Sequence, residues 1–446
     1  MSVLPSDRWP GRLALVVLLA ICGCRRAAEP PVQPTPFPPA PRDPVGWAGW
    51  RGPNASGVAP GGCRAVHFSP AAGIRWYAEV PGQGHSSPAV RDDVVLLTTA
   101  LTETDPPTLA VLCYDRNDGR PMWKTEVGPA QGRTHTKNGY ASATVATDGQ
   151  RVYSFFGSTG LFCHDLAGKQ VWRAELGDLD HQYGSAASPV LYGDLVIQLC
   201  DCEKRSSITA FDKRSGKEVW RTPRPSIGGW ATPVTIEAEV NGKRRTELVV
   251  NGTEGKSPEE RMVIAYDPAD GRELWRVRGM TRYVAPTMLV GQGMLFSTSG
   301  RNGPIIAIRP GGSGDVTDTH VAWRLERGGP YIPTGLFYGG RVYVLGDAGD
   351  LNCYDAATGQ GIWKDRFRGS FTASLVAADG RIYAVDERGT VYVFAAGDSF
   401  RLIAQNDLQA KVLATPAIAG GELFLRTESR LYCIPGAETA SVPEGK

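Results

Sequence analysis

A short pattern recurs along this chain and constrains its fold more than any other feature. From Ala210 to Trp220 it places a small residue, an aspartate two positions later, a glycine and finally a tryptophan. Asp212 can hydrogen-bond its own turn and Gly216 can adopt positive φ, so the pattern predicts a β-hairpin. Further copies run from Cys113 to Trp123, Cys163 to Trp172, Ala265 to Trp275 and Cys353 to Trp363, with a degenerate copy from Ala307 to Trp323.

A second marker alternates with these hairpins and consists of a small residue, a proline or alanine, and an apolar strand. It occurs at Ser87-Pro88, Ser142-Ala143, Ser188-Pro189, Thr232-Pro233, Ala285-Pro286, Ile332-Pro333, Thr372-Ala373 and Thr415-Pro416. Runs of strand formers, such as Arg151 to Phe155, lie between each marker and the next hairpin. Each unit of about 40 to 55 residues therefore predicts four short antiparallel strands, which is one propeller blade. The eight markers predict an all-β, eight-bladed β-propeller.

The two ends of the repeat region are complementary. Residues 411–435 offer three strands without a tryptophan strand, whereas residues 73–80 contain a tryptophan strand, with Trp76, that lacks preceding partners. We expect the N-terminal strand to complete the last blade, so that the propeller spans residues 73–436 and the ring has no open edge at this junction.

The first 45 residues are expected to direct and tether the chain. Residues 1–24 carry two arginines, an apolar run from Leu13 to Ile21 and a final Cys24, which is typical of an export signal too short to span a bilayer. The end of this segment resembles the bacterial lipoprotein signal, which implies lipidation of Cys24. Cys22 follows the bulky Ile21 and fits that signal less well, and a plain secretory signal is the alternative. Residues 25–45 contain eight prolines and predict an extended tether.

Two further segments flank the propeller. Residues 46–72 form an aromatic and glycine-rich lead-in segment, whose Trp47 and Trp50 are expected to pack as a lid against the outside or base of the propeller. A ligand-stacking role for either tryptophan would need an open face. Residues 437–446 form a polar tail.

The charge balance argues against nucleic acid as a partner. The chain has 48 basic and 46 acidic residues and a formal net charge of +2, so it lacks the excess of positive charge that a polyanion-binding surface needs.

The hairpin frame resembles the tryptophan-docking motif of the quinoprotein alcohol dehydrogenase-like, PQQ-repeat β-propeller superfamily. The resemblance covers about residues 70–435 and implies one of two activities. One branch contains periplasmic dehydrogenases that bind pyrroloquinoline quinone (PQQ), and the other contains cofactor-free lipoproteins similar to the propeller subunit of the outer-membrane β-barrel assembly machine. In both branches the docking tryptophans are packing residues, which here are Trp76, Trp123, Trp172, Trp220, Trp275, Trp323 and Trp363.

The dehydrogenase branch implies a quinone held over Ca²⁺, a catalytic aspartate and commonly a disulfide between adjacent cysteines. A hard cation needs several converging oxygen ligands, and the spacing of Asp178, Asp180 and Glu254 assembles no such set. The nearest approach to adjacent cysteines is Cys200-Asp201-Cys202. We therefore predict no catalytic residue, no metal and no cofactor, with a PQQ- and Ca²⁺-dependent dehydrogenase as the alternative.

The cysteines are expected to be structural. Cys113, Cys163, Cys353 and Cys433 occupy the hairpin position that alanine fills in other copies, so they are expected to act as small buried residues. Cys200 and Cys202 could bind a metal or be redox-active, but no Cys-x-x-Cys motif or nearby histidine spacing supports that role.

The loops that precede the first strand of each blade should form a rim around the central channel. Histidines lie in the first three of these loops, and the others add aromatic and basic residues. The candidate rim consists of His85, His135, Lys137, Tyr140, His181, Tyr183, Trp230, Arg282, Tyr283, Tyr331, Arg368 and Lys411. We expect this rim to bind an anionic small molecule, a peptide segment or a partner protein. A solvated loop face without function is the alternative.

These observations predict an exported, lipid-anchored propeller at the cell envelope, as a periplasmic or outer-membrane lipoprotein. It would act as a binding scaffold without catalysis, would contact the membrane through its lipid anchor and would be monomeric. The partner would be an envelope protein or an anionic small ligand. A quinoprotein dehydrogenase and a purely structural surface protein are the competing classes.

Overall fold

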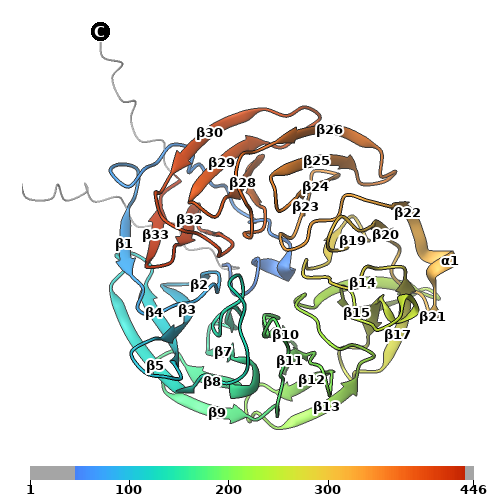
Figure 1. Ribbon diagram of the computed structural model, residues 1–446, viewed down its shortest axis with the longest axis horizontal. Helices are drawn as coiled ribbons and strands as arrows, with labels where there is room; N and C mark the ends of the chain where they lie inside the picture. Colours follow the sequence, from blue (N-terminus) through green and yellow to red (C-terminus); the bar gives the residue numbers. More distant parts are fainter. Residues whose placement is uncertain (1–45, 437–446) are drawn as a thin grey trace, which may run out of the picture. The chain divides into compact units, whose positions relative to one another are not determined.

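The computed structural model describes residues 46–436, which form eight β-sheets around a central axis (Figure 1). This arrangement confirms the predicted eight-bladed propeller. The expected signal segment, the lipidation at Cys24, the proline-rich tether and the polar tail lie outside the described residues. Within residues 46–436, no helix combines the length and the apolar composition that crossing a membrane requires.

The blades follow one another in chain order, and each begins at the axis. Blade 1 contains β2 (Ala89–Arg91), β3 (Val94–Leu101), β4 (Thr108–Asp115) and β5 (Pro121–Pro129). Blade 2 contains β6 (Ala146–Thr147), β7 (Arg151–Phe155), β8 (Leu161–Asp165) and β9 (Gln170–Ala174). Blade 3 contains β10 (Val190–Tyr192), β11 (Leu195–Cys200), β12 (Ser207–Asp212) and β13 (Glu218–Pro223). Blade 4 contains β14 (Val234–Val240), β15 (Lys243–Val250), β16 (Met262–Tyr266) and β17 (Glu273–Arg278).

The second half of the ring repeats this order. Blade 5 contains β18 (Leu289–Gly291), β19 (Met294–Thr298), β20 (Ile305–Ile308) and β22 (Val321–Leu325). Blade 6 contains β23 (Leu336–Tyr338), β24 (Arg341–Leu345), β25 (Asp350–Asp355) and β26 (Gly361–Arg366). Blade 7 contains β27 (Val376–Ala378), β28 (Arg381–Val385), β29 (Thr390–Ala395) and β30 (Leu402–Asp407). Blade 8 contains β31 (Ala417–Ala419), β32 (Glu422–Arg426), β33 (Arg430–Ile434) and the N-terminal β1 (Trp76–Glu79).

The last blade confirms the predicted closure of the ring. β1 pairs with β33 in antiparallel register, with Trp76 opposite Cys433 (Figure 1). A buried ion cluster reinforces this junction, because Glu422 of blade 8 forms an ion pair with Arg75 at 3.0 Å and accepts a hydrogen bond from Arg116 of blade 1 at 3.3 Å. The ends of the propeller are therefore joined by both a strand and a charge network.

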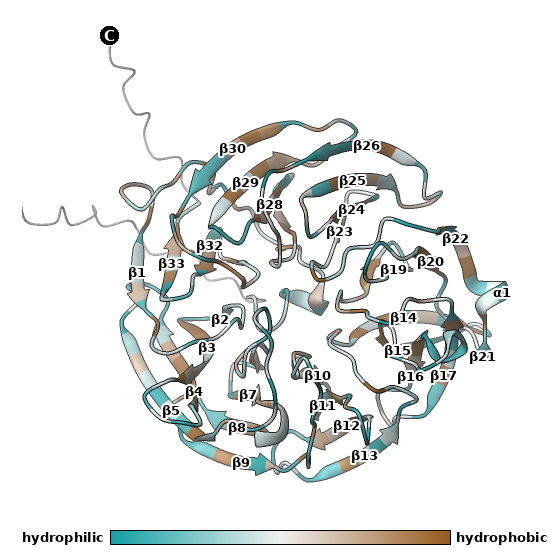
Figure 2. Cartoon of the chain, in the orientation of Figure 1, coloured by the Kyte–Doolittle hydropathy of each residue, from teal (hydrophilic) through white to brown (hydrophobic). Residues whose placement is uncertain are grey.

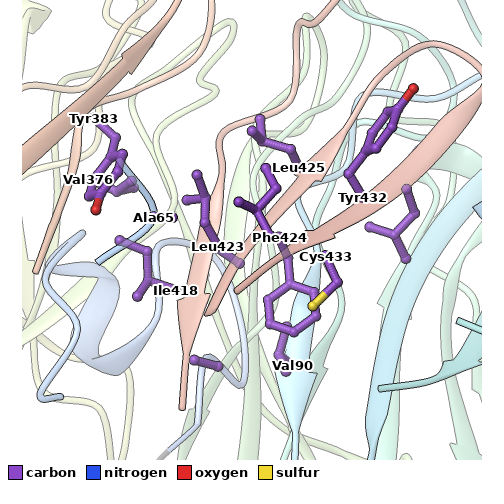
Figure 3. Close-up of a cluster of buried hydrophobic side chains, with 14 of the residues drawn as sticks. Ala65, Val90, Val376, Tyr383, Ile418, Leu423, Phe424, Leu425, Tyr432 and Cys433 are labelled. Carbon is purple, nitrogen blue, oxygen red and sulfur yellow. The ribbon is translucent and has the colours of Figure 1, made fainter. Parts of the chain in front are cut away.

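Hydropathy along the strands matches their place in each blade (Figure 2). The middle strands are apolar on both faces because neighbouring blades cover them, as in β28, where Ile382 to Val385 are fully buried. The outermost strands alternate, as in β1, because one face meets solvent. Figure 3 shows the resulting core, in which blade 8 side chains such as Phe424 and Ile418 lie between Val90 of blade 1 and Val376 of blade 7.

The repeated tryptophans dock each blade on the next. Trp172 packs against Gly216 of the following blade, whose φ is +72°. Its indole N–H donates to the carbonyl of Lys213 at 3.1 Å. Equivalent donations to the next blade join Trp76 to Arg116, Trp123 to Leu166, Trp220 to Pro268, Trp323 to Ala356 and Trp363 to Gly397.

A small residue lies across the hairpin from each docking tryptophan. Cys113, Cys163, Cys353 and Cys433 each stand opposite a tryptophan, and all are buried free thiols, as the sequence predicted. Their small volume leaves room for the indole at this cross-strand position.

Blade 4 departs from the repeat that the sequence predicts. The insertion between β20 and β22 contributes β21 (Gly314–Asp315), which pairs in parallel with β17, and α1 (Thr317–His320). The indole of Trp275 therefore cannot dock on the degenerate fifth hairpin and donates instead to the buried carboxylate of Glu247 at 2.8 Å. The short helices η1 (Pro53–Ala55), η2 (Gly157–Thr159) and η3 (Pro258–Glu260) complete the described structure.

Candidate functional site

A cavity lies on the axis of the propeller, where loops from all eight blades converge. Its volume is about 150 Å³. Six of the predicted rim residues line this central cavity, namely His85, His135, Lys137, Tyr183, Trp230 and Tyr331. We call the side of the propeller on which these loops lie the channel face.

A ring of hydroxyl residues joins the blades at this cavity. Each innermost strand is preceded, two positions earlier, by a serine or threonine: Ser87, Thr144, Ser188, Thr232, Thr287, Thr334, Ser374 and Thr415. At six of the eight junctions in the described chain, this residue accepts the backbone N–H of its counterpart in the preceding blade at 2.9 to 3.0 Å. The two exceptions are the junctions between blades 4 and 5 and between blades 8 and 1.

The lead-in segment passes through the channel beneath this ring. Trp47 pairs with Val90 of blade 1, and Val58 pairs with Ala377 of blade 7. The buried guanidinium of Arg51 donates twice to the carbonyl of Gly335 in blade 6, at 2.8 and 2.9 Å. The lead-in segment therefore contacts several blades and lies at the centre of the ring (Figure 1).

This position corrects the expectation that both tryptophans pack on the outside or base of the propeller. Trp47 is fully buried in the core. Trp50 lines the central cavity and donates its indole N–H to the hydroxyl of Thr287 at 2.9 Å. This bond occupies a hydroxyl at one of the two junctions where the ring is interrupted.

A loop from blade 2 reaches over the central cavity. Its Lys137 donates to Glu387 of blade 7 at 2.7 Å, although the two blades are not neighbours in the ring. Asn138 of the same loop donates to the carbonyl of Tyr183, and His135 packs edge-on against the Tyr183 ring at 5.4 Å. The central cavity therefore lies between Trp50 and this loop.

An aromatic and cationic wall forms one side of the site. The rings of Tyr183, Trp230 and Tyr283 lie 6.0 to 6.4 Å apart. Arg301, which the sequence analysis missed, lies 4.6 Å above the Tyr283 ring and 4.9 Å from the Tyr331 ring. Such cation–π contacts hold the charge next to the aromatic surface.

A buried carboxylate supports this wall. Glu254 is 2 % exposed and meets the Nε2 atom of His181 and the Nε atom of Arg282, both at 3.1 Å. His181 packs edge-on against Trp230 at 4.9 Å, and Arg282 lies over Tyr283. His181 and Arg282 therefore contact the rings of Trp230 and Tyr283 and pair with Glu254, but they do not line the central cavity.

A second cavity of about 440 Å³ lies between blades 8, 1 and 2, and we call it the cationic cavity. It contains the predicted residues Tyr140 and Lys411 and shares His85 and His135 with the central cavity. Burial, together with the positive charges of Arg426 and Lys411, lowers the pKa of His85 to about 4. Arg368 is exposed and lines neither cavity, so the structure does not bring it to the site.

The residues at the axis do not fit a calcium-bound quinone. The lining of the central cavity contains hydroxyls, histidines, a lysine and aromatic rings, but no carboxylate that could ligate a hard cation. Within residues 46–436, no group of three or more histidine, cysteine, aspartate or glutamate side chains could hold a metal ion.

The cysteine pair of blade 3 is not a disulfide. Cys200 and Cys202 are buried free thiols, and burial raises the pKa of Cys200. A buried protonated thiol is a poor nucleophile and a poor metal ligand.

The fold defines the class of this protein, which is an eight-bladed propeller of PQQ-like repeats. Its ring of blades is closed, and each docking tryptophan except Trp275 bonds the next blade. A family model described as outer membrane protein assembly factor BamB matches residues 58–200, 204–337 and 320–402. The chain belongs to this family, which confirms the resemblance identified from the hairpins.

Individual relatives agree with this assignment. The assembly factor BamB of Yersinia pestis is 24% identical over 343 residues, which cover 73% of this chain and 80% of that protein. BamB of Bordetella pertussis is 22% identical over 423 residues, which cover 93% of this chain and 83% of that protein. This protein is thus similar to outer membrane assembly factors along most of its length.

Two solved structures share the fold. The crystal structure of BamB from Moraxella catarrhalis has a TM-score of 0.57 at 15% identity and covers 82% of this chain and 99% of its own. Quinohemoprotein alcohol dehydrogenase from Comamonas testosteroni has a TM-score of 0.67 at 14% identity, with coverages of 91% and 82%. At such identities the likeness concerns the fold alone.

Proposed function

We propose that this protein is a non-enzymatic scaffold of the bacterial cell envelope that binds a partner protein through its channel face. The observation that carries the proposal is the gathering of aromatic and cationic side chains at the axis in a member of an assembly-factor family. Aromatic and arginine side chains dominate the binding energy of most protein interfaces. The partner would be another component of outer membrane assembly.

The proposed anchor fits this role. Lipidation of Cys24 would attach the chain to the membrane, and the proline-rich tether would hold the propeller away from it. Replacing the anchor residue tests this arrangement. A Cys24→Ser variant should leave the membrane fraction of fractionated cells, whereas Cys22→Ser should stay there. Retention of Cys24→Ser in the membrane fraction would refute the anchor.

The channel face is tested by comparing two double variants of the full chain in cells. Arg301→Ala with Tyr331→Ala removes two contact groups of the aromatic wall. The control, Met122→Ala with Val219→Ala, removes exposed apolar side chains from the circumference, where they are 47% and 52% exposed. Envelope proteins that co-purify with the wild type should fall at least about tenfold with the first variant and persist with the second. Equal recovery with both variants would refute binding at the channel face.

A further inference from the structure

A buried arginine without a carboxylate partner lies at the junction of blades 8 and 1. Arg426 is 1% exposed and donates through Nη1 to the hydroxyl of Ser86 at 2.7 Å and to the carbonyl of Thr98 at 2.8 Å. Its Nε and Nη2 atoms are buried and have no hydrogen-bond partner among the described residues. An unpaired buried charge is costly, so this guanidinium requires an explanation.

The opposite side of the ring shows that the blade junction itself does not need a cation. At the junction of blades 4 and 5, which also lacks the hydroxyl link, the neutral side chain of Asn251 makes the equivalent bridge. Its amide donates to the carbonyls of Pro286 at 2.7 Å and of Thr298 at 3.2 Å, which correspond to Ser86 and Thr98 in blade 1. A neutral amide therefore donates hydrogen bonds to the two equivalent positions, so this bridge does not explain why residue 426 carries a charge.

Arg426 is one of the residues that line the cationic cavity. Nε and Nη2 form the side of the guanidinium that binds a carboxylate or phosphate with two parallel hydrogen bonds. Gly84 packs closely against this edge, because a Cβ atom there would lie only 2.6 Å from Nη2. The Nδ1 atom of His85 is also buried without a partner and lines the same cavity.

The charges of the cationic cavity favour an anion. Arg426 and Lys411 supply two cations, and the one carboxylate in the lining, Glu428, already pairs with Lys411 at 3.3 Å. Arg426 lies at the buried end and Lys411 is half exposed, so an anion would meet Lys411 before it reaches the guanidinium.

We propose that the cationic cavity binds a small free oxyanion, a phosphate or a carboxylate, on the Nε and Nη2 edge of Arg426. The buried position of this edge suits a small anion rather than a lipid headgroup. The inference deepens the proposed function, since the cavity shares His85 and His135 with the rim, but anion binding can be measured on the purified chain without any partner.

The test compares the full wild-type chain with Arg426→Asn, which copies the neutral bridge of Asn251. Thermal unfolding and calorimetric titration are recorded with inorganic phosphate and with acetate, at an ionic strength held constant with sodium chloride. We expect one of the two anions to raise the melting temperature of the wild type in a concentration-dependent way. Arg426→Asn should keep a cooperative transition and lose this response. The stronger of the two responses identifies the chemistry.

A second variant keeps the test decisive if Arg426→Asn does not fold. Lys411→Met leaves the bridge of Arg426 intact and should weaken anion binding about tenfold, because one of two cations is lost. The proposal is overturned if neither anion acts on the wild type beyond the chloride control, or if a folded Arg426→Asn variant responds as the wild type does. An unchanged affinity in Lys411→Met would also overturn it. Anion binding by the purified wild type, together with equal partner recovery by the two double variants in cells, would refute the proposed function alone.

Discussion

At the scale of single residues, the contact between tryptophan and glycine connects the repeated sequence to the repeated structure. Gly216 has positive φ and lies against the Trp172 ring. Asp212 holds the turn by accepting the hydroxyl of Ser215 at 2.7 Å and its backbone N–H at 2.8 Å, and these hydrogen bonds lower the pKa of the Asp212 carboxyl. The glycine is therefore needed both for its backbone conformation and for its missing side chain.

Replacing this glycine should separate the two requirements. A Cβ atom at Gly216 would lie 2.5 Å from the Trp172 ring, whereas at Gly193, which has φ of +54°, it would meet nothing within 4 Å. We expect Gly216→Ala to cost about 2 to 4 kcal/mol, from backbone strain and overpacking together, and Gly193→Ala about 1 kcal/mol from strain alone. Urea unfolding measures both values. Equal losses would show that the tryptophan contact is not tight.

A buried histidine should make stability depend on pH. His164 is fully buried beside Phe162, both ring nitrogens lack partners, and burial lowers its pKa from 6.5 to about 4. The unfolded chain therefore binds a proton between pH 6.5 and 4 that the folded chain does not, so stability falls as the pH is lowered through this range. The slope due to His164 should approach about 1.4 kcal/mol per pH unit.

The matching experiment measures the free energy of unfolding from pH 7 to pH 4.5 in the wild type and in His164→Leu. The variant should lose the part of the slope that His164 contributes. Identical slopes in the two proteins would mean that the folded chain accommodates a protonated His164.

At the scale of elements, the hydroxyl ring shows what the sequence could and could not predict. The eight markers gave the correct number of blades, because each strand start needs a small residue there. In four blades, however, the marker was placed on Ser142, Ala285, Ile332 and Thr372, two positions before the residue that occupies the ring. Proline explains two of these shifts, because it follows the hydroxyl in Ser87-Pro88 but precedes it in Pro286-Thr287 and Pro333-Thr334. In the other two blades alanine precedes the hydroxyl. A search for a hydroxyl at a fixed distance from each strand would have found the ring.

The ring should contribute measurably to stability. Thr334 accepts the backbone N–H of Thr287 at 3.0 Å, and Thr334→Val leaves that buried N–H without an acceptor. We expect a loss of about 1 to 3 kcal/mol in the free energy of unfolding. Thr246→Val is the control, because the hydroxyl of Thr246 bonds Glu237 at an exposed position, and it should change stability by less than about 0.5 kcal/mol. A loss no larger than the control's would assign the ring no stabilising role.

At the scale of the whole molecule, the sequence predicted the propeller and its closure but only part of the channel face. The connections between second and third strands lie on the same face as the loops that enter each blade. They contribute Glu254, Arg301 and Glu387, and Arg426 ends the second strand of blade 8 on the same side. Hairpin periodicity identifies these connections but does not show which side chains meet across the axis. The contact between Lys137 and Glu387, for example, joins residues 250 positions apart.

The central claim is that this propeller meets its partner through the channel face, and position-resolved photo-crosslinking in cells tests it most directly. A photoreactive residue is placed at Tyr331 or Lys411 on the channel face, at Val219 on the circumference, and at Asp270 in a hairpin turn outside both cavities. The account predicts a shared protein adduct at Tyr331 and Lys411 and none at the other two positions. Adducts confined to Val219 or Asp270 would contradict it.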